Sequence, residues 1–239
     1  MSKIISALLL TAGLTICAAP MASALEISPY VSAKYAYTHM QNDAKATVDI
    51  SGIANNTLVD KKLSDNTNGL RLAVGATVPV DAIWGDIRGE VEFAYNAYTD
   101  NKGNASFDWG SGTPVDITFK NKLRTKAVFF NVYYDIETCT DFIPYVGGGI
   151  GYARLKHKAR LVGDAENGKD RENNFAWNVG LGLGYIVTEN ITLDLGYRYT
   201  DYGNIKNTAI ETRPYATITS ASKYDITSHE VSLGLRYNF

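Results

Sequence analysis

The sequence predicts an all-β fold, an antiparallel eight-stranded transmembrane up-and-down β-barrel with short periplasmic turns and four long external loops. Apolar and polar residues alternate in segments of about ten residues, the length that a tilted strand needs to cross a bilayer. The connections between these segments are short and long in turn. In the last segment, apolar residues stand at every second position: Val231, Leu233, Leu235, Tyr237 and Phe239.

The N-terminal residues have the three parts of a secretory signal peptide. Lys3 supplies a positive charge, residues 4–16 form an apolar run, and Ala22-Ser23-Ala24 matches an A-x-A cleavage site. The run is too short for a membrane-spanning helix. We therefore expect a signal peptide over residues 1–24 and one outer-membrane barrel domain over residues 25–239.

The composition agrees with many two-faced strands. The chain of 239 residues has 16 Tyr and 21 Gly but only 6 Pro. Its formal net charge of −2 argues against a nucleic-acid partner. Cys139 is the one cysteine after the predicted cleavage site, so no intrachain disulfide is expected.

Eight segments carry the period-two pattern, and each has an apolar face for lipid and a second face for the lumen. In the fourth segment we assign Val128, Phe130 and Val132 to lipid, because the opposite choice would place Asn131 in hydrocarbon. In chain order the segments are residues 27–39, 70–78, 87–96, 127–134, 144–152, 175–185, 191–199 and 229–239.

The connections support a barrel rather than a soluble sandwich. Short turns are expected at residues 79–81, 137–141 and 188–190. Long polar connections cover residues 41–67, 100–120 and 201–224, and a charged one follows the fifth segment. A sandwich has no reason to keep its long loops at one end, whereas outer-membrane barrels do. Aromatic residues also gather near the segment ends, as in the interfacial girdles of such barrels.

Four stretches carry a family resemblance: residues 144–152, 132–135, 193–199 and the terminal Phe239. With them the chain resembles the eight-stranded outer-membrane family that includes opacity proteins and the OmpA-type transmembrane domain. The resemblance implies the Gram-negative outer membrane, a monomer, and Tyr237 and Phe239 as an assembly signal for the barrel-assembly machinery and periplasmic chaperones. It implies a structural, adhesive or surface-antigen role through the external loops, with host surface molecules as partners. The alternative is a small porin-like channel for minor solutes.

Charged residues of both signs fall on the predicted lumen face. They could line a permeation path, or they could fill the lumen as an ion-pair network. Eight strands enclose a space only about wide enough for side chains, and near-balanced charges suggest mutual neutralisation, so we expect the network. Its predicted members are Lys34, Arg71, Arg88, Glu90, Glu92, Asp194, Arg198, Glu230 and Arg236.

A second group of cations continues the lipid-facing register of the fourth, fifth and sixth segments beyond their apolar residues. We call this group the basic ridge, and expect it to contact lipopolysaccharide phosphates or sulfated host glycans through charge-assisted hydrogen bonds. The alternative is a solvated surface compensated by Asp164, Glu166, Asp170 and Glu172. The ridge consists of Lys122, Arg124, Lys126, Arg154, Lys156, Lys158, Arg160 and Arg171.

Catalytic, metal and cofactor sites are not predicted. Enzymes on such barrels need a histidine with a serine or carboxylate partner, or paired carboxylates. The histidines are His39, His157 and His229, and no Gly-x-Ser-x-Gly motif accompanies them. His39 and His229 lie on the first and last segments, which become neighbours when a barrel closes. No spacing typical of metal ligands is present in the sequence.

Overall fold

The structure is a computed structural model that describes residues 27–50, 53–80, 85–107, 115–161, 168–213 and 216–239. In the outer parts of the strands it describes the backbone alone. The predicted signal peptide lies outside the described residues. No helix among the described residues is long and apolar enough to cross a membrane.

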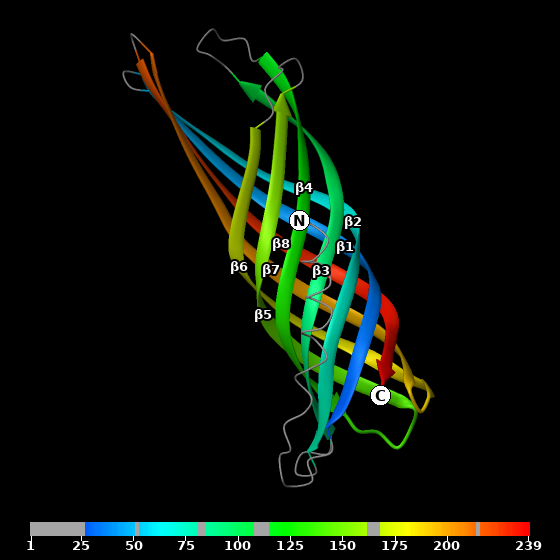
Figure 1. The fold of residues 1–239 in the computed structure, drawn as a ribbon. Coiled ribbons are helices and arrows are strands. Elements are labelled where there is room, and N and C mark those ends of the chain that lie inside the picture. The colour runs from blue at the N-terminus through cyan, green and yellow to red at the C-terminus, as the bar shows by residue number, and fades with distance from the viewer. Residues whose placement is uncertain (1–26, 51–52, 81–84, 108–114, 162–167, 214–215) are drawn as a thin grey trace, which may run out of the picture.

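Eight antiparallel strands form one closed barrel, in which each strand pairs with the next and β1 pairs with β8 (Figure 1). The predicted fold class is confirmed. The strands are β1 Ser28–Ile50, β2 Ile53–Val80, β3 Gly85–Phe107, β4 Val115–Ile136, β5 Phe142–Leu161, β6 Gly168–Thr188, β7 Ile191–Arg213 and β8 Ala216–Asn238.

The strands are longer than the predicted segments. They range from 20 residues in β5 to 28 in β2, and they continue through most of the stretches expected to be long loops. Those stretches are polar on both faces, so they carry no period-two signal. Their backbone groups nevertheless pair across each hairpin, as in the register of Ala44 with Lys61. Polar side chains on both faces suit a ladder that stands in water.

The barrel therefore has two different ends. At the short-turn end, β4 and β5 are joined by residues 137–141, and β6 and β7 by Glu189 and Asn190. At the hairpin end, the strand pairs β1–β2, β3–β4, β5–β6 and β7–β8 extend outward (Figure 1). The two ends differ in length as the sequence predicts, but the extra length at the hairpin end belongs largely to paired strand extensions rather than to loops.

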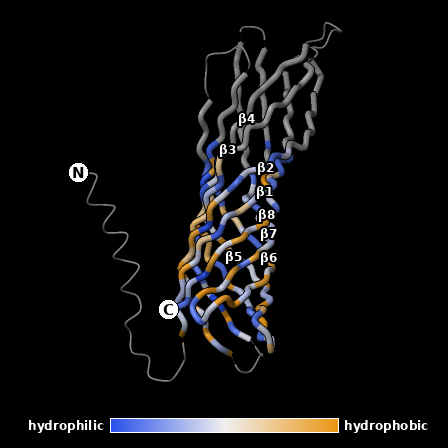
Figure 2. Tube along the Cα trace, turned by 90° about the vertical axis from the view of Figure 1, so that its right-hand side faces the viewer, coloured by the Kyte–Doolittle hydropathy of each residue, from blue (hydrophilic) through white to orange (hydrophobic). Residues whose placement is uncertain are grey.

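Side chains alternate strictly between wall and lumen in the middle of the barrel. On β8 the exposed Val231, Leu233 and Leu235 are interrupted by the buried Ser232 and by Gly234. Figure 2 shows hydrophobic and hydrophilic residues alternating along the strands of this zone. The apolar residues are on the outside, the reverse of a soluble protein, because lipid rather than water surrounds the wall.

One irregularity lies where β7 leaves this zone. Between Asp201 and Asn204 the register with β8 shifts. Gly203 has a φ of 76°, a left-handed conformation that favours glycine, and its N–H donates to Asp201 Oδ1 at 2.7 Å. The Asn174 side chain of β6 donates to the carbonyl of Tyr202 at 3.2 Å. This bulge fixes the backbone directly after Tyr202, whose ring is buried in the lumen.

Candidate functional site

Among the described residues, five cations and five carboxylates are buried or nearly buried in the lumen. Nine of them are the residues predicted from the sequence, and the structure brings all nine together. The tenth is Asp135, which sequence reasoning missed. Asp135 has the same parity as Asn131 and Tyr133 on β4, so extending the lumen face by one more residue pair would have found it. With Asp135 the opposite charges are equal in number.

Asp135 lies nearest the short-turn end and accepts hydrogen bonds from two arginines. Nε of Arg88 is 2.9 Å from the Asp135 carboxylate, and Nη1 of Arg236 is 3.4 Å from it. The rings of Tyr133 and Tyr145 lie against the Arg88 guanidinium, with centroids 4.4 and 4.9 Å away. Arg88 is thus held by a carboxylate and by two aromatic faces.

Two carboxylates occupy the middle of the lumen. Asp194 accepts from Lys34 Nζ at 2.9 Å and from the Tyr145 hydroxyl at 2.6 Å. Glu90 accepts from the Tyr30 hydroxyl at 2.7 Å. Tyrosine hydroxyls therefore supply hydrogen bonds to these carboxylates in addition to those from cations, although Oδ2 of Asp194 is buried without a hydrogen-bond partner. A buried charge is tolerated when such hydrogen bonds satisfy it.

Toward the hairpin end, the next layer of lumen charges is centred on Glu230, which pairs with two arginines. Glu230 accepts from Arg71, whose Nε lies 3.2 Å away, and from Nη2 of Arg198 at 2.8 Å. Arg198 reaches with its other nitrogen to Glu92 at 2.8 Å, and Arg71 donates to the Asn96 side chain at 2.7 Å. These residues come from β2, β3, β7 and β8, so the layer ties the two halves of the barrel together across its axis.

Above this layer the lumen is closed by apolar side chains. Met40, Phe129, Leu155, Tyr202 and Ile226 are buried and belong to one cluster. They come from β1, β4, β5, β7 and β8, and therefore meet across the lumen. Sequence reasoning missed this cluster, because Met40, Leu155, Tyr202 and Ile226 stand singly among mostly polar residues, and Phe129 lies within an apolar run that points to lipid as well as to the lumen. These residues could have been found as apolar residues at lumen-facing positions, where most other residues are polar.

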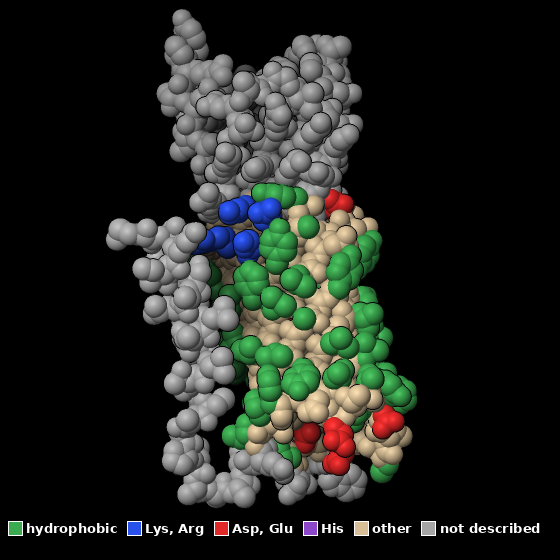
Figure 3. All heavy atoms as spheres, turned by 45° about the vertical axis from the view of Figure 1, so that its right-hand side comes forward, with side chains coloured by type: hydrophobic (Ala, Val, Ile, Leu, Met, Phe, Trp, Pro, Cys, Tyr) green, Lys and Arg blue, Asp and Glu red, His purple; other side chains and the backbone are tan. Residues whose placement is uncertain are grey.

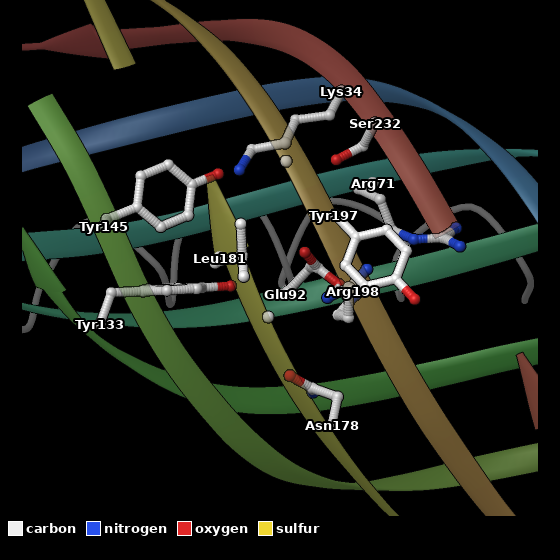
Figure 4. Close-up of a pocket in the computed structure, with 12 residues that line it drawn as sticks. Lys34, Arg71, Glu92, Tyr133, Tyr145, Asn178, Leu181, Tyr197, Arg198 and Ser232 are labelled. Atoms are coloured by element: carbon white, nitrogen blue, oxygen red, sulfur yellow. Dashed lines mark hydrogen bonds and ion pairs between the residues drawn. The ribbon is translucent and has the colours of Figure 1, made fainter. Parts of the chain in front are cut away.

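Little space remains between these groups. A cavity of about 20 Å³, room for about one water, lies among side chains of the middle layers (Figure 4). Figure 4 shows the Lys34 ammonium group pointing toward the Tyr145 hydroxyl beside this cavity. Glycines on the lumen face leave room for long side chains. A Cβ at Gly182 would collide with the Tyr145 ring, and one at Gly149 with the Asn131 amide.

The basic ridge lies on the outer wall, where β4 and β5 leave the apolar band. The last apolar row is Val128 opposite Tyr152, with side chains 50% and 57% exposed. The four following rows each place a cation directly opposite a cation. These register partners are Lys126 with Arg154, Arg124 with Lys156, Lys122 with Lys158, and Lys120 with Arg160. Figure 3 shows lysine and arginine side chains gathered directly beyond the apolar band.

Side-chain positions are described for four ridge residues. Arg124 lies over the Tyr98 ring at 4.0 Å, Lys126 lies over the Tyr95 ring at 5.5 Å, and Arg154 donates to the Asn173 amide at 3.0 Å. Lys156 is half-buried. The side chains of Lys122, Lys158, Arg160 and Arg171 lie outside the described part, and their backbone register alone places them. Arg171 is the register partner of Lys156 on β6.

The chain matches a known protein family over most of its length. Residues 7–239 fit the family described as "Outer membrane protein beta-barrel domain". This chain is a member of that family. It is therefore a β-barrel protein of the Gram-negative outer membrane, as expected from the sequence, with its short-turn end in the periplasm and its hairpin end outside.

Its relatives include opacity proteins. Opacity protein opA57 of Neisseria gonorrhoeae is 27% identical over 250 residues, which cover 88% of this chain and 97% of that protein. Outer membrane protein PagN of Salmonella typhimurium is 33% identical over 161 residues, covering 64% of this chain and 65% of PagN, less than two thirds of its length. This barrel is thus of the opacity-protein type.

Among solved structures, the outer membrane protein OprG from Pseudomonas aeruginosa has a similar fold. Its TM-score is 0.51 at 13% identity, and the match covers 89% of this chain and 96% of OprG. At this identity the likeness concerns the fold alone.

Two histidines of this outer-membrane barrel meet at its closing seam. His39 of β1 and His229 of β8 are register partners. Nδ1 of His39 lies 2.8 Å from the Asn66 amide oxygen, and Nδ1 of His229 lies 2.7 Å from the Tyr197 hydroxyl. These partners are an amide and a phenol, not the serine or carboxylate of a nucleophilic triad. The described residues contain no group of three or more potential metal ligands, and the His157 side chain is outside them.

The predicted assembly signal lies at the short-turn end of the same seam. Tyr237 and Phe239 project outward, and their rings make an edge contact with centroids 5.2 Å apart. The Phe239 N–H donates to the Pro29 carbonyl at 3.0 Å, and the Asn238 N–H to the Asn190 carbonyl at 2.8 Å. The C-terminal residues therefore bond to β1 and to the β6–β7 turn at once.

Proposed function

We propose that this barrel is a non-enzymatic surface protein that attaches the cell to host surface molecules through its external hairpins. The observation that carries the proposal is the filled lumen. Paired charges occupy its middle, and the apolar cluster of Met40, Phe129, Leu155, Tyr202 and Ile226 closes it toward the outside. The surface left for interaction with other molecules is then the hairpin end. The relationship to opacity proteins agrees with this reading.

Attachment is tested by shortening the hairpins without disturbing the membrane zone. Ala44 and Lys61 are register partners, as are Asn207 and Ser222. Replacing residues 45–60 or 208–221 by Asn-Gly, which favours a two-residue turn, keeps each pair in register. The β3–β4 hairpin can be closed in the same way at Asn101 and Asn121. The β5–β6 hairpin would be closed at His157 and Asp170, in a fourth variant.

Cells that express each variant are compared on surfaces coated with host matrix components and on epithelial cells. We expect attachment to fall to the level of cells without the protein when all four hairpins are shortened. Surface amount and the heat-dependent shift on detergent gels must stay at the wild-type level. Wild-type attachment by the four-hairpin variant would contradict the proposal.

The porin-like alternative is separated by conductance. In planar bilayers we expect no steady conductance from the wild-type protein. The variant Phe129→Ala/Leu155→Ala, which opens the apolar cluster, is the matched positive comparison. Steady channels in the wild type would overturn the closed-lumen part of the proposal. The non-enzymatic part is checked with lipase and protease assays in micelles, where turnover that is lost in His229→Ala would overturn it.

A further inference from the structure

We propose that the basic ridge binds the phosphate groups of lipopolysaccharide in the outer leaflet, with the facing pairs Lys126–Arg154 and Arg124–Lys156 each holding one phosphate. The first observation is the register itself. Directly opposed residues of an antiparallel pair project from the same face, and like charges in that arrangement are destabilising. The two rows whose side chains are described, Lys126 with Arg154 and Arg124 with Lys156, are therefore unfavourable for the protein alone. A multivalent anion bound between the facing side chains would remove this repulsion.

The position of the ridge selects the anion. Lys126 and Arg154 form the row directly after Val128 and Tyr152, which face hydrocarbon. The outer edge of the hydrocarbon is where lipopolysaccharide carries its phosphates. At this edge water is partly excluded, so a charge-assisted hydrogen bond is stronger than in bulk water. Arginine also offers the planar fork that matches phosphate oxygens, and each of the two rows with described side chains, Lys126–Arg154 and Arg124–Lys156, contains one arginine.

The described side chains of the ridge are partly fixed before any ligand arrives. The Arg124 guanidinium rests on the Tyr98 ring, and the Arg154 Nε–H donates to Asn173. Fixed side chains lose less conformational freedom on binding, which favours affinity. Both contacts leave guanidinium nitrogens available, because a ring contact uses the face of the group and the Asn173 bond uses one N–H.

Compensation by nearby carboxylates explains the ridge less well. Of the four acids considered from the sequence, Glu172 is the one whose side chain is described, and its register partner is Leu155. Leu155 is buried in the lumen, so Glu172 shares the lumen parity, whereas Arg154 and Lys156 have the outward parity. Asp100 of β3 is the register partner of Lys122, so a carboxylate can compensate that outer row. In the innermost row the register partners on the flanking strands are Tyr95 and Asn173, which are uncharged.

The test uses purified full-length protein in detergent micelles with added bisphosphorylated lipid A. The variant is Lys126→Gln/Arg154→Gln, which neutralises the innermost row and leaves neutral, hydrogen-bonding side chains. The matched control is Lys206→Gln/Lys223→Gln. Lys206 and Lys223 are also register partners of like charge, on β7 and β8, but His229, Thr227 and Asp225 separate Lys223 from the apolar band.

We expect lipid A to raise the unfolding temperature of the wild type and of the control, and to remain bound through purification. In the variant we expect binding roughly tenfold weaker, because hydrogen bonds to charged groups contribute about that factor in affinity. Unfolding temperatures without lipid A show that each protein is folded. Equal lipid A effects in variant and wild type, or equal effects of dephosphorylated lipid A, would overturn the proposal.

A heparin arm separates the phosphate ligand from sulfated glycans. Stabilisation of the wild type by heparin but not by lipid A, lost in the variant, would overturn the proposal in favour of a glycan surface. The lipid A arm contains no host material, so its result is independent of the proposed attachment through the hairpins.

Discussion

The lumen and the basic ridge place charged residues in opposite ways. In the lumen, each carboxylate lies within hydrogen-bonding reach of cations or tyrosine hydroxyls from other strands, as around Glu230. On the ridge, cations face cations across β4 and β5. The two regions lie mostly on different strands: apart from Asp135 of β4, the lumen charges come from β1, β2, β3, β7 and β8, whereas the ridge lies on β4, β5 and β6.

The difference follows from whether the surroundings of each region can supply counter-charges. No solvent or ligand can neutralise a charge inside a filled lumen, so the protein must supply each counter-charge itself. The ridge faces the membrane surface, where mobile ions or lipid phosphates can supply it. A charge on this barrel therefore has a structural role in one region and is available for binding in the other. The following predictions test that division, beginning with the largest effect.

Removing the Glu230 carboxylate should cost the most. Glu230→Ala leaves Arg71 and Arg198 without their shared partner in the lumen, and loss of one side of a buried ion pair costs about 3–5 kcal/mol. Urea-dependent folding in lipid vesicles measures this loss. The control is Glu189→Ala in the exposed β6–β7 turn, where we expect under about 0.5 kcal/mol. Similar results for the two variants would show that the lumen charges are not mutually dependent.

A charge placed on the lipid face should be nearly as costly. Leu195 faces lipid between its register partners Leu183 and Leu233. Leu195→Arg should destabilise by about 2–4 kcal/mol if this row is near the bilayer midplane. Leu195→Ala separates loss of packing from the cost of the charge. If folding titrations give the same free energy of unfolding for Leu195→Arg and Leu195→Ala, then Leu195 does not face lipid.

The tightness of the lumen is tested by a single methyl group. In Gly182→Ala the new Cβ would meet the Tyr145 ring, which must then move away from Asp194, and overpacking of this kind costs about 1–3 kcal/mol. The matched control is Gly89→Ala, where no atom lies within 4 Å of the new Cβ. We expect the control to fold like the wild type. Equal unfolding midpoints would indicate that the lumen has spare volume.

The smallest effect belongs to the ridge in the absence of any lipopolysaccharide. Lys126→Gln/Arg154→Gln removes one facing pair of like charges and should leave stability unchanged or raise it by about 0.2–1 kcal/mol. Added salt should stabilise the wild type more than this variant, because salt screens exposed charges. Unfolding at two salt concentrations measures both. A clear loss of stability would mean that the ridge cations are held by the protein itself, as in the lumen.

The sequence by itself determined the architecture and the facing of the membrane zone. Alternation along Val231 to Phe239 assigns each residue to lipid or lumen, since a strand offers two faces and lipid accepts one kind of side chain. The same parity placed nine lumen charges on one face. The predicted fourth segment ended at residue 134, one residue before Asp135, and the strand extensions were missed because both of their faces are polar and the pattern disappears.

Only the tertiary structure decided which groups meet. Closure brings β1 against β8 and sets Arg198 of β7 within reach of Glu92 on β3, and no periodicity along one strand specifies partners across a lumen. The closing cluster of Met40, Phe129, Leu155, Tyr202 and Ile226 arises in the same way, from single residues on five strands. Register likewise decided that Lys126 faces Arg154. Alternation along a strand predicts whether a residue faces lipid or lumen, but the pairing between strands decides which residue lies beside it.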